Sequence, residues 1–175
     1  MRGRLLVGAF LIGLVAIGVA AAGLNRNWSA HATGSQEVPP RETQAQAQAI
    51  FQLSKDETSI DYKLIAANIE NVVQAHIHRN IPGMNGPIVV WLYPSTAPGP
   101  ALPAGGGRLD GVIAQGTITG ADIAPTAPAD YSLGRLVADL NNGNAYVNLH
   151  TNDGVGDPNT GPGDFPGGEI RADVR

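Results

Sequence analysis

Two histidines stand one residue apart in this chain, His76 and His78, within the segment QAHIH. The segment is predicted to be a β-strand, in which successive side chains point to opposite faces, so both imidazoles share one face. Positions two apart are separated by about 6.5 to 7 Å, and rings that lean together can bind one ion with bonds of about 2.0–2.1 Å. The pair is therefore a candidate metal chelate.

A third histidine, His150, ends the alternating segment YVNLH, which places it on the face opposite Val147. If its strand lies beside that of His76 and His78, three imidazoles converge on one point. Three neutral nitrogen ligands with an open fourth position suit copper or zinc, whereas calcium and magnesium prefer oxygen ligands. We expect His76, His78 and His150 to bind copper, with zinc as the alternative.

Other polar residues are expected close to this site. Those expected to hydrogen-bond to the ligands are Tyr146, Asn148, Glu169 and Arg171. His31, near the N-terminus expected after export, is a candidate fourth ligand, and a solvated tail histidine is the alternative. The three central histidines could instead form a hydrogen-bonded structural cluster or a pH sensor, because imidazole titrates near about pH 6.5.

The loop from Asn152 to Asp164 is a second place to consider for a metal, because Asp153, Asp157 and Asp164 stand there among glycines. Oxygen ligands on a flexible turn can bind calcium. The spacing matches no EF-hand loop, and aspartate and asparagine are ordinary turn formers. Calcium in this loop is therefore not favoured.

Alternation of apolar and polar residues predicts the strands that must position the histidines. Residues 44–53 place Ala47, Phe51 and Leu53 on one face, whereas a helix would spread the apolar residues around its circumference. A turn at 54–57 leads to a return strand that begins near Ile60. Further strands are predicted at 72–78, 88–92, 111–119, 145–151 and 169–174, with surface loops at 94–108 and 152–168.

One helix interrupts this pattern. Leu133, Leu136, Val137 and Leu140 form a single helical stripe, and Asn142-Gly143 provides a left-handed stop after it. Seven or so antiparallel strands with one short crossover helix most simply close as a two-layer sandwich. The predicted fold class is all-β.

The first residues predict export. Arg2 and Arg4 precede an uncharged, largely apolar run from Leu5 to Leu24, which is the arrangement of a secretory signal. Cleavage after Ala22 is expected, and an uncleaved membrane anchor is the alternative. Residues 1–24 would then be the signal or anchor, and residues 25–175 a single domain that is periplasmic, secreted or anchored to the outer face of the inner membrane.

Composition excludes several functions. The chain has no cysteine, so disulfides and thiolate metal sites are excluded. Its net charge is −4 and only 15% of its residues are charged, so nucleic acid is not an expected partner. Contact with a membrane is expected only through the N-terminal segment. No nucleophile elbow, phosphate loop or dinucleotide fingerprint occurs.

Five segments, in order, carry a resemblance to a known family: GSQEVPP at 34–40, AHIH at 75–78, NGPIV at 85–89, YVNLHT at 146–151 and GGEIR at 167–171. Together they resemble the CHRD domain, a module named for its copies in chordin and also found in exported bacterial proteins. The resemblance spans residues 28–175 and implies an immunoglobulin-like β-sandwich. It implies no activity, and the chain lacks the cysteine-rich repeats that accompany the domain in chordin.

A weaker similarity is to copper/zinc superoxide dismutase, another β-sandwich, in which a His-x-His strand pair binds copper. His76 and His78 match that pair, and His150 could be a further copper ligand. No bridging histidine, zinc subsite or disulfide is evident. The similarity is one of fold and carries no activity by itself.

Three functions follow. The favoured one is an extracytoplasmic copper- or zinc-binding protein for storage, delivery or sensing. The second is a copper redox enzyme that acts on superoxide or another small oxidant, and the sequence does not decide whether the protein is an enzyme. The third is an adhesion module that binds another exported or surface protein through a sandwich face or the 94–108 loop.

Overall fold

The computed structural model describes residues 25–94 and 104–175. These residues contain eight β-strands, one α-helix and two short 3-10 turns. In chain order the elements are β1 (Asn27–Thr33), η1 (Gly34–Gln36), β2 (Gln46–Leu53), β3 (Ile60–Glu70), β4 (Val72–Arg79), β5 (Ile88–Tyr93), β6 (Arg108–Ile118), η2 (Gly120–Asp122), α1 (Leu133–Asn142), β7 (Ala145–Thr151) and β8 (Ile170–Asp173).

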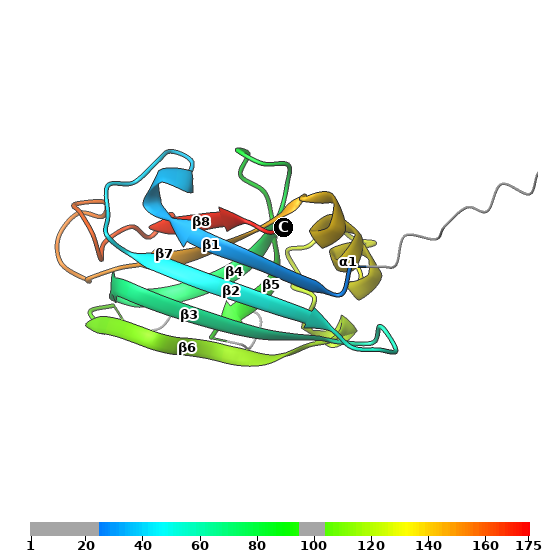
Figure 1. Ribbon diagram of the computed structural model, residues 1–175. Coiled ribbons are helices and arrows are strands. Elements are labelled where there is room, and N and C mark those ends of the chain that lie inside the picture. Colours follow the sequence, from blue (N-terminus) through cyan, green and yellow to red (C-terminus); the bar gives the residue numbers. More distant parts are fainter. Residues whose placement is uncertain (1–24, 95–103) are drawn as a thin grey trace, which may run out of the picture.

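The eight strands form one antiparallel sheet in the order β5-β4-β7-β8-β1-β2-β3-β6. The sheet folds over at the junction of β8 and β1, where the registered pairing is limited to Thr33 with Arg171. Figure 1 shows β1, β2, β3 and β6 side by side in one layer, with β4, β5 and β7 in the layer behind. The two layers make the antiparallel β-sandwich that the sequence predicts.

The core lies between the layers and is built by alternation along each strand. In β2, every second residue from Ala47 to Leu53 is buried, and its neighbours are exposed or half-buried. In the opposite layer, Ile77 of β4 pairs with Val147 of β7, and Val147 pairs with Ala172 of β8. These three side chains are buried in the core. The other face of β4 and β7 therefore points away from the core.

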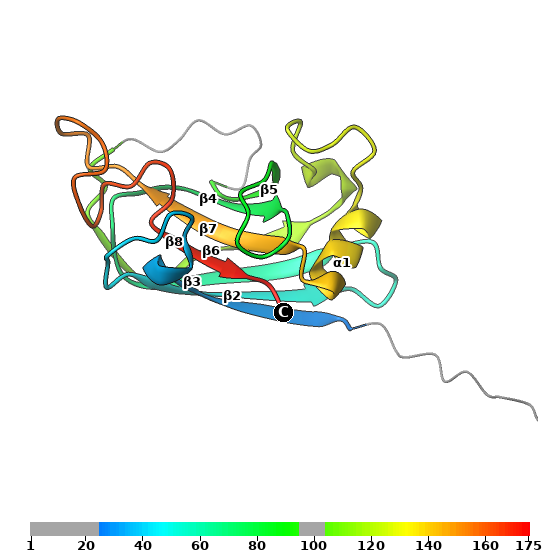
Figure 2. The same cartoon turned by 90° about the horizontal axis from the view of Figure 1, so that it is seen from above.

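The helix α1 has the boundaries that its sequence predicts. The Ser132 hydroxyl accepts a hydrogen bond from the Arg135 N–H at 3.3 Å, which caps the first turn. Gly143 ends the helix with φ of 68°, a left-handed conformation that glycine adopts without steric cost. Leu133, Leu136 and Leu140 are buried, and the helix lies at one end of the sandwich (Figures 1 and 2).

Two elements differ from the prediction. The strand β1 was not predicted, and it pairs with β2 along its whole length. The strand β6 begins at Arg108, three residues before the predicted start. The segments 1–24 and 95–103, which carry the export prediction and most of the 94–108 loop, lie outside the described residues. In the part of the chain that the structure describes, no helix is long and apolar enough to cross a membrane.

Candidate metal centre

Strand register brings the three central histidines to one face. His76 is paired with Asn148 across β4 and β7, His78 with Tyr146, and Gln74 with His150. Directly paired residues of antiparallel strands point to the same side of a sheet. All of these side chains therefore lie on the face that points away from the core.

The three imidazoles lie within the reach of one ion. One nitrogen from each of His76, His78 and His150 lies within 4.8 Å of the other two. Nδ1 of His76 is 3.3 Å from Nε2 of His150. Two ligands of a tetrahedral ion with bonds of about 2.1 Å are about 3.4 Å apart, so this pair already has the spacing of two ligands.

Backbone carbonyls determine which nitrogens are free. Nδ1 of His78 donates to the Gly86 carbonyl oxygen at 2.9 Å, and Nδ1 of His150 donates to the Pro166 carbonyl oxygen at 2.8 Å. A carbonyl only accepts, so both Nδ1 atoms carry the proton and both Nε2 atoms keep a lone pair. Hydrogen bonds of this kind are typical of histidines that bind metals.

Burial leaves two of the nitrogens without partners. His76 is 1% exposed and His78 is 8% exposed, and Nε2 of each is buried with no hydrogen-bond partner among the described residues. Buried polar atoms are normally paired, because leaving one unpaired costs about 1–3 kcal/mol. His150 is partly exposed and is the most accessible of the three. The free Nε2 of His78, whose lone pair has no donor, fits a cation that is bound by nitrogen.

The surroundings keep all three imidazoles neutral. Burial, together with the neighbouring His150 and His78, lowers the pKa of His76 to about 2. Burial lowers the pKa of His78 to about 4, partly opposed by its hydrogen bond to Gly86. Burial also lowers the pKa of His150. Neutral imidazole is the form that binds a metal, and a cluster whose imidazoles stay neutral near pH 7 is poorly suited to sense pH there.

Aromatic rings hold the histidines in place. The ring of Tyr146 stacks on His78, with centroids 4.8 Å apart and planes within 7° of parallel. The Arg171 guanidinium lies 3.5 Å from the centroid of the same tyrosine ring. Trp91 packs edge-to-face against His76, with centroids 4.2 Å apart. These contacts restrict the orientations that the two imidazoles can adopt.

The loop after β4 closes one side of the site through Asn85 and Gly86. The Gly86 N–H donates to the Tyr146 hydroxyl at 3.0 Å, while its carbonyl receives the bond from His78. A Cβ at Gly86 would lie 1.9 Å from the Arg79 carbonyl oxygen, so a side chain has no space there. Asn85 accepts a hydrogen bond from Arg171 and donates one to the Val38 carbonyl oxygen. These bonds join the loop after β4 to β7, to β8 and to the segment after η1, all beside the histidines.

Of the four residues that were expected beside the ligands, three lie there and one does not. Tyr146, Asn148 and Arg171 lie at the site, as the register and stacking contacts require. Glu169 is buried, but its carboxylate accepts bonds from Thr43, Thr151 and the Gly163 N–H. Glu169 thus holds the loops that border the site and makes no hydrogen bond to a histidine.

Sequence reasoning missed one charged residue, Glu37. It is 5% exposed, and its Oε1 atom has no hydrogen-bond partner in the part of the chain that the structure describes. Burial raises the pKa of Glu37, while the Val38 N–H, Arg171 and Asn148 oppose that shift. Glu37 lies in the 34–40 segment, which was used for the resemblance, but a lone glutamate in a loop carried no chemical signal of its own.

The other candidate ligands stay apart from the cluster. His31 is exposed on β1, which is separated from β7 by β8, so the structure does not bring it to the other histidines. Asp153 accepts a bond from the Val155 N–H, and Asp164 accepts bonds from Thr160, so both shape the turns of their loop. Within residues 25–94 and 104–175, the group of three histidines is the one with metal-ligand spacing.

The five segments that carry the family resemblance meet around this site. Glu37, His76, Gly86 and Asn148 come from four of them, and Arg171 comes from the fifth. In Figure 2 the loops after β1, β4 and β7 gather around β7 and β8. A family model for the CHRD domain matches residues 28–157. The chain belongs to the CHRD domain family.

The CHRD match covers β1 to β7 and all three clustered histidines, and it ends before β8. No curated protein and no solved structure matches the chain significantly. The family assignment therefore supports the fold, and the site has to be judged from its own geometry.

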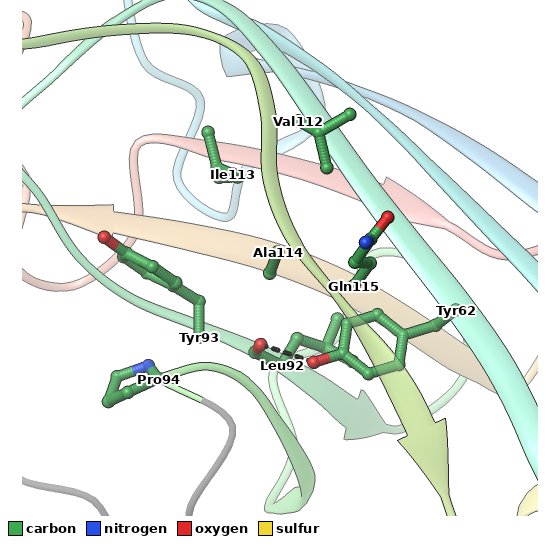
Figure 3. Close-up of a pocket in the computed structure, with 8 residues that line it drawn as sticks. All are labelled: Tyr62, Leu92, Tyr93, Pro94, Val112, Ile113, Ala114 and Gln115. Atoms are coloured by element: carbon green, nitrogen blue, oxygen red, sulfur yellow. Dashed lines mark hydrogen bonds between the residues drawn. The ribbon is translucent and has the colours of Figure 1, made fainter.

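A groove of about 500 Å³ lies elsewhere on this CHRD domain, between β3 and β6 and the end of β5 (Figure 3). Tyr62 is part of its lining, and the Tyr62 hydroxyl donates a hydrogen bond to the Leu92 carbonyl oxygen at 2.8 Å. Its remaining lining is Tyr93, Pro94, Val112, Ile113, Ala114 and Gln115. The described lining is mostly aromatic and aliphatic, which suits the binding of an apolar partner.

Proposed function

We propose that this CHRD protein is an exported metal-binding protein that holds one copper or zinc ion through His76, His78 and His150, for storage, delivery or sensing. The observation that carries the proposal is the convergence of three imidazole nitrogens within 4.8 Å in a buried setting. The unpartnered Nε2 atom of His78 supports it.

The ligand types favour copper or zinc over the hard cations. Imidazole nitrogen suits copper and zinc, and the cluster contains no carboxylate of the kind that calcium and magnesium require. Copper is our first choice, because for a given nitrogen site its divalent ion binds more tightly than zinc.

The location outside the cytoplasm rests on the sequence of residues 1–24. Arg2 and Arg4 followed by a long uncharged run support translocation of everything after that run. We expect the mature protein to begin at Gly23, after cleavage behind Ala22. N-terminal sequencing of protein recovered from an exporting host tests this, and an intact N-terminus would support a membrane anchor instead.

Burial favours binding over redox turnover. His76 and His78 are covered by loops and aromatic rings, and His150 alone is partly open to solvent. An enzyme needs an open coordination position that its substrate can reach. A copper-loaded protein that is active on superoxide, and loses that activity on His150→Ala, would favour the redox function.

Metal analysis tests the proposal directly. Purified full-length protein is dialysed against copper or zinc at defined free concentrations, and bound metal is measured by elemental analysis. We expect one ion per chain in the wild type and in His31→Ala, and none in the His76→Ala/His78→Ala double variant. A double variant that retains the full stoichiometry would rule out these ligands.

The groove in Figure 3 supports a second candidate, an interaction module in which the histidines only stabilise the fold. Its wall includes Val112, which is 55% exposed on an edge strand. In that case metal and chelator would change neither the melting temperature nor the binding of a partner protein. A chelator-sensitive melting temperature would count against it.

A further inference from the structure

Asn148 lies between the histidine strand β4 and the strand β8 at the candidate metal site. Its backbone pairs with His76 on one side and with Arg171 on the other, and His150 follows it by two residues on the same face of β7. Asn148 is 5% exposed, so its amide needs partners within the protein. The identity of these partners shows whether the amide is free to bind a cation.

The amide oxygen of Asn148 faces a histidine nitrogen that carries no proton. Oδ1 lies 3.1 Å from Nε2 of His150, its one side-chain partner among the described residues. Nδ1 of His150 donates to the Pro166 carbonyl oxygen, so Nε2 of the neutral ring carries no proton. Both atoms therefore direct lone pairs at the same space, an arrangement that a cation between them makes favourable.

The distances match those between ligands of one ion. Oδ1 of Asn148 is 3.1 Å from Nε2 of His150, and Nδ1 of His76 is 3.3 Å from the same nitrogen. Ligands of a tetrahedral site with bonds of about 2.1 Å are about 3.4 Å apart.

We propose that Oδ1 of Asn148 is the fourth ligand of the ion that His76, His78 and His150 hold. This inference rests on the proposed function. It describes a closed site with three nitrogens and one oxygen. A site whose fourth position is filled by the protein stores or delivers its ion, whereas a catalytic site keeps that position for water or substrate.

Glu37 holds the amide in the ligating orientation. The NH₂ group of Asn148 faces the Glu37 carboxyl, which leaves the amide oxygen on the histidine side. Gly168 leaves the space for this contact, because a Cβ there would lie 2.5 Å from Glu37 Oε1 and 3.1 Å from Asn148 Nδ2. A carboxylate that orients a ligand in this way is a positioning residue.

The experiment uses the full chain loaded with Cu²⁺, in the wild type and in Asn148→Ala. Affinity is measured by competition with a chelator, and metal-bound water is measured by water-proton relaxation. We expect Asn148→Ala to bind at least about tenfold more weakly and to gain a metal-bound water that the wild type lacks. Equal affinity together with unchanged relaxation would overturn the inference and leave the three-histidine site in place.

Asn148→Asp keeps the test decisive if the alanine variant does not fold. A carboxylate oxygen in the same place is expected to tighten Cu²⁺ binding and to change the copper hyperfine splitting in the EPR spectrum. An EPR spectrum identical to that of the wild type would contradict ligation by residue 148. Failure of the wild type itself to bind any ion would instead refute the proposed function, so the two failures are distinguishable.

Discussion

The outward faces of the two sandwich layers belong to one sheet, yet they differ in their chemistry. On β1, His31 is exposed to solvent and pairs with Gln48 of β2. On β4, His76 and His78 are buried, although the same alternation places them on an outward face. All three are histidines at outward positions of a strand, but His31 is surrounded by solvent and the other two are covered by protein.

The difference lies in the loops. The carbonyl oxygens of Gly86 and Pro166, both in loops, accept hydrogen bonds from the Nδ1–H groups of His78 and His150. The loops also exclude water, and this burial lowers the pKa of the covered imidazoles. A strand supplies the spacing of the ligands, and the loops make those ligands neutral, oriented and free of solvent.

Metal binding should have the largest effect on stability and should distinguish the two outward faces. At a free ion concentration about 100 times the Kd, the free energy of unfolding should rise by about 2.7 kcal/mol in the wild type and in His31→Ala. The His76→Ala/His78→Ala variant should show no rise. Chemical denaturation with and without chelator measures this, and an equal rise in all three proteins would erase the distinction between the faces.

Acid should destabilise the metal-free protein through the covered face. The unfolded chain binds a proton at each histidine below about pH 6.5, whereas folded His76 binds one only near pH 2. Since the unfolded state then binds more protons, stability should fall as pH drops from about 6.5 toward 4, by up to about 1.4 kcal/mol per pH unit for His76.

His76→Gln should reduce that dependence on pH, and His31→Ala should leave it unchanged. Both variants are compared with the wild type by urea denaturation at a series of pH values. A pH dependence that is the same in all three proteins would show that His76 is not held neutral by the fold.

A side chain at Gly86 should disturb the cover of the site. Gly86→Ala places a Cβ 1.9 Å from the Arg79 carbonyl oxygen, so the loop must move, at a cost of about 1–3 kcal/mol. The hydrogen bond to His78 should weaken and metal affinity should fall. Gly120→Ala is the matched control, since nothing lies within 4 Å of its added Cβ. Melting temperature and metal titration distinguish the two.

The smallest effect is expected at Glu37. Glu37→Gln keeps the shape of the side chain but removes the carboxylate that orients Asn148, so metal affinity should fall about tenfold. The metal-free protein should be as stable as the wild type or more stable, because a buried carboxyl with an unpartnered oxygen is lost. A loss of stability without a loss of affinity would assign Glu37 a structural role alone.

Local periodicity was enough to predict most of the fold. The alternation in β2 and β7 and the stripe of α1 each report which side of an element faces the core, because the repeat of the backbone is written into neighbouring residues. The strand β1 alternates too, with Trp28, Ala30 and Ala32 buried. Small alanines and the nearby export segment hid that signal.

The sequence by itself determined the antiparallel sandwich, the CHRD resemblance and the shared face of His76 and His78. Only the tertiary structure decided that His150 joins them, that His31 does not, and that Glu37 lies beside Asn148. The reason is the range of the interactions. Strand alternation is a property of adjacent residues, whereas the docking of three loops over one face depends on partners up to 126 positions apart in the chain.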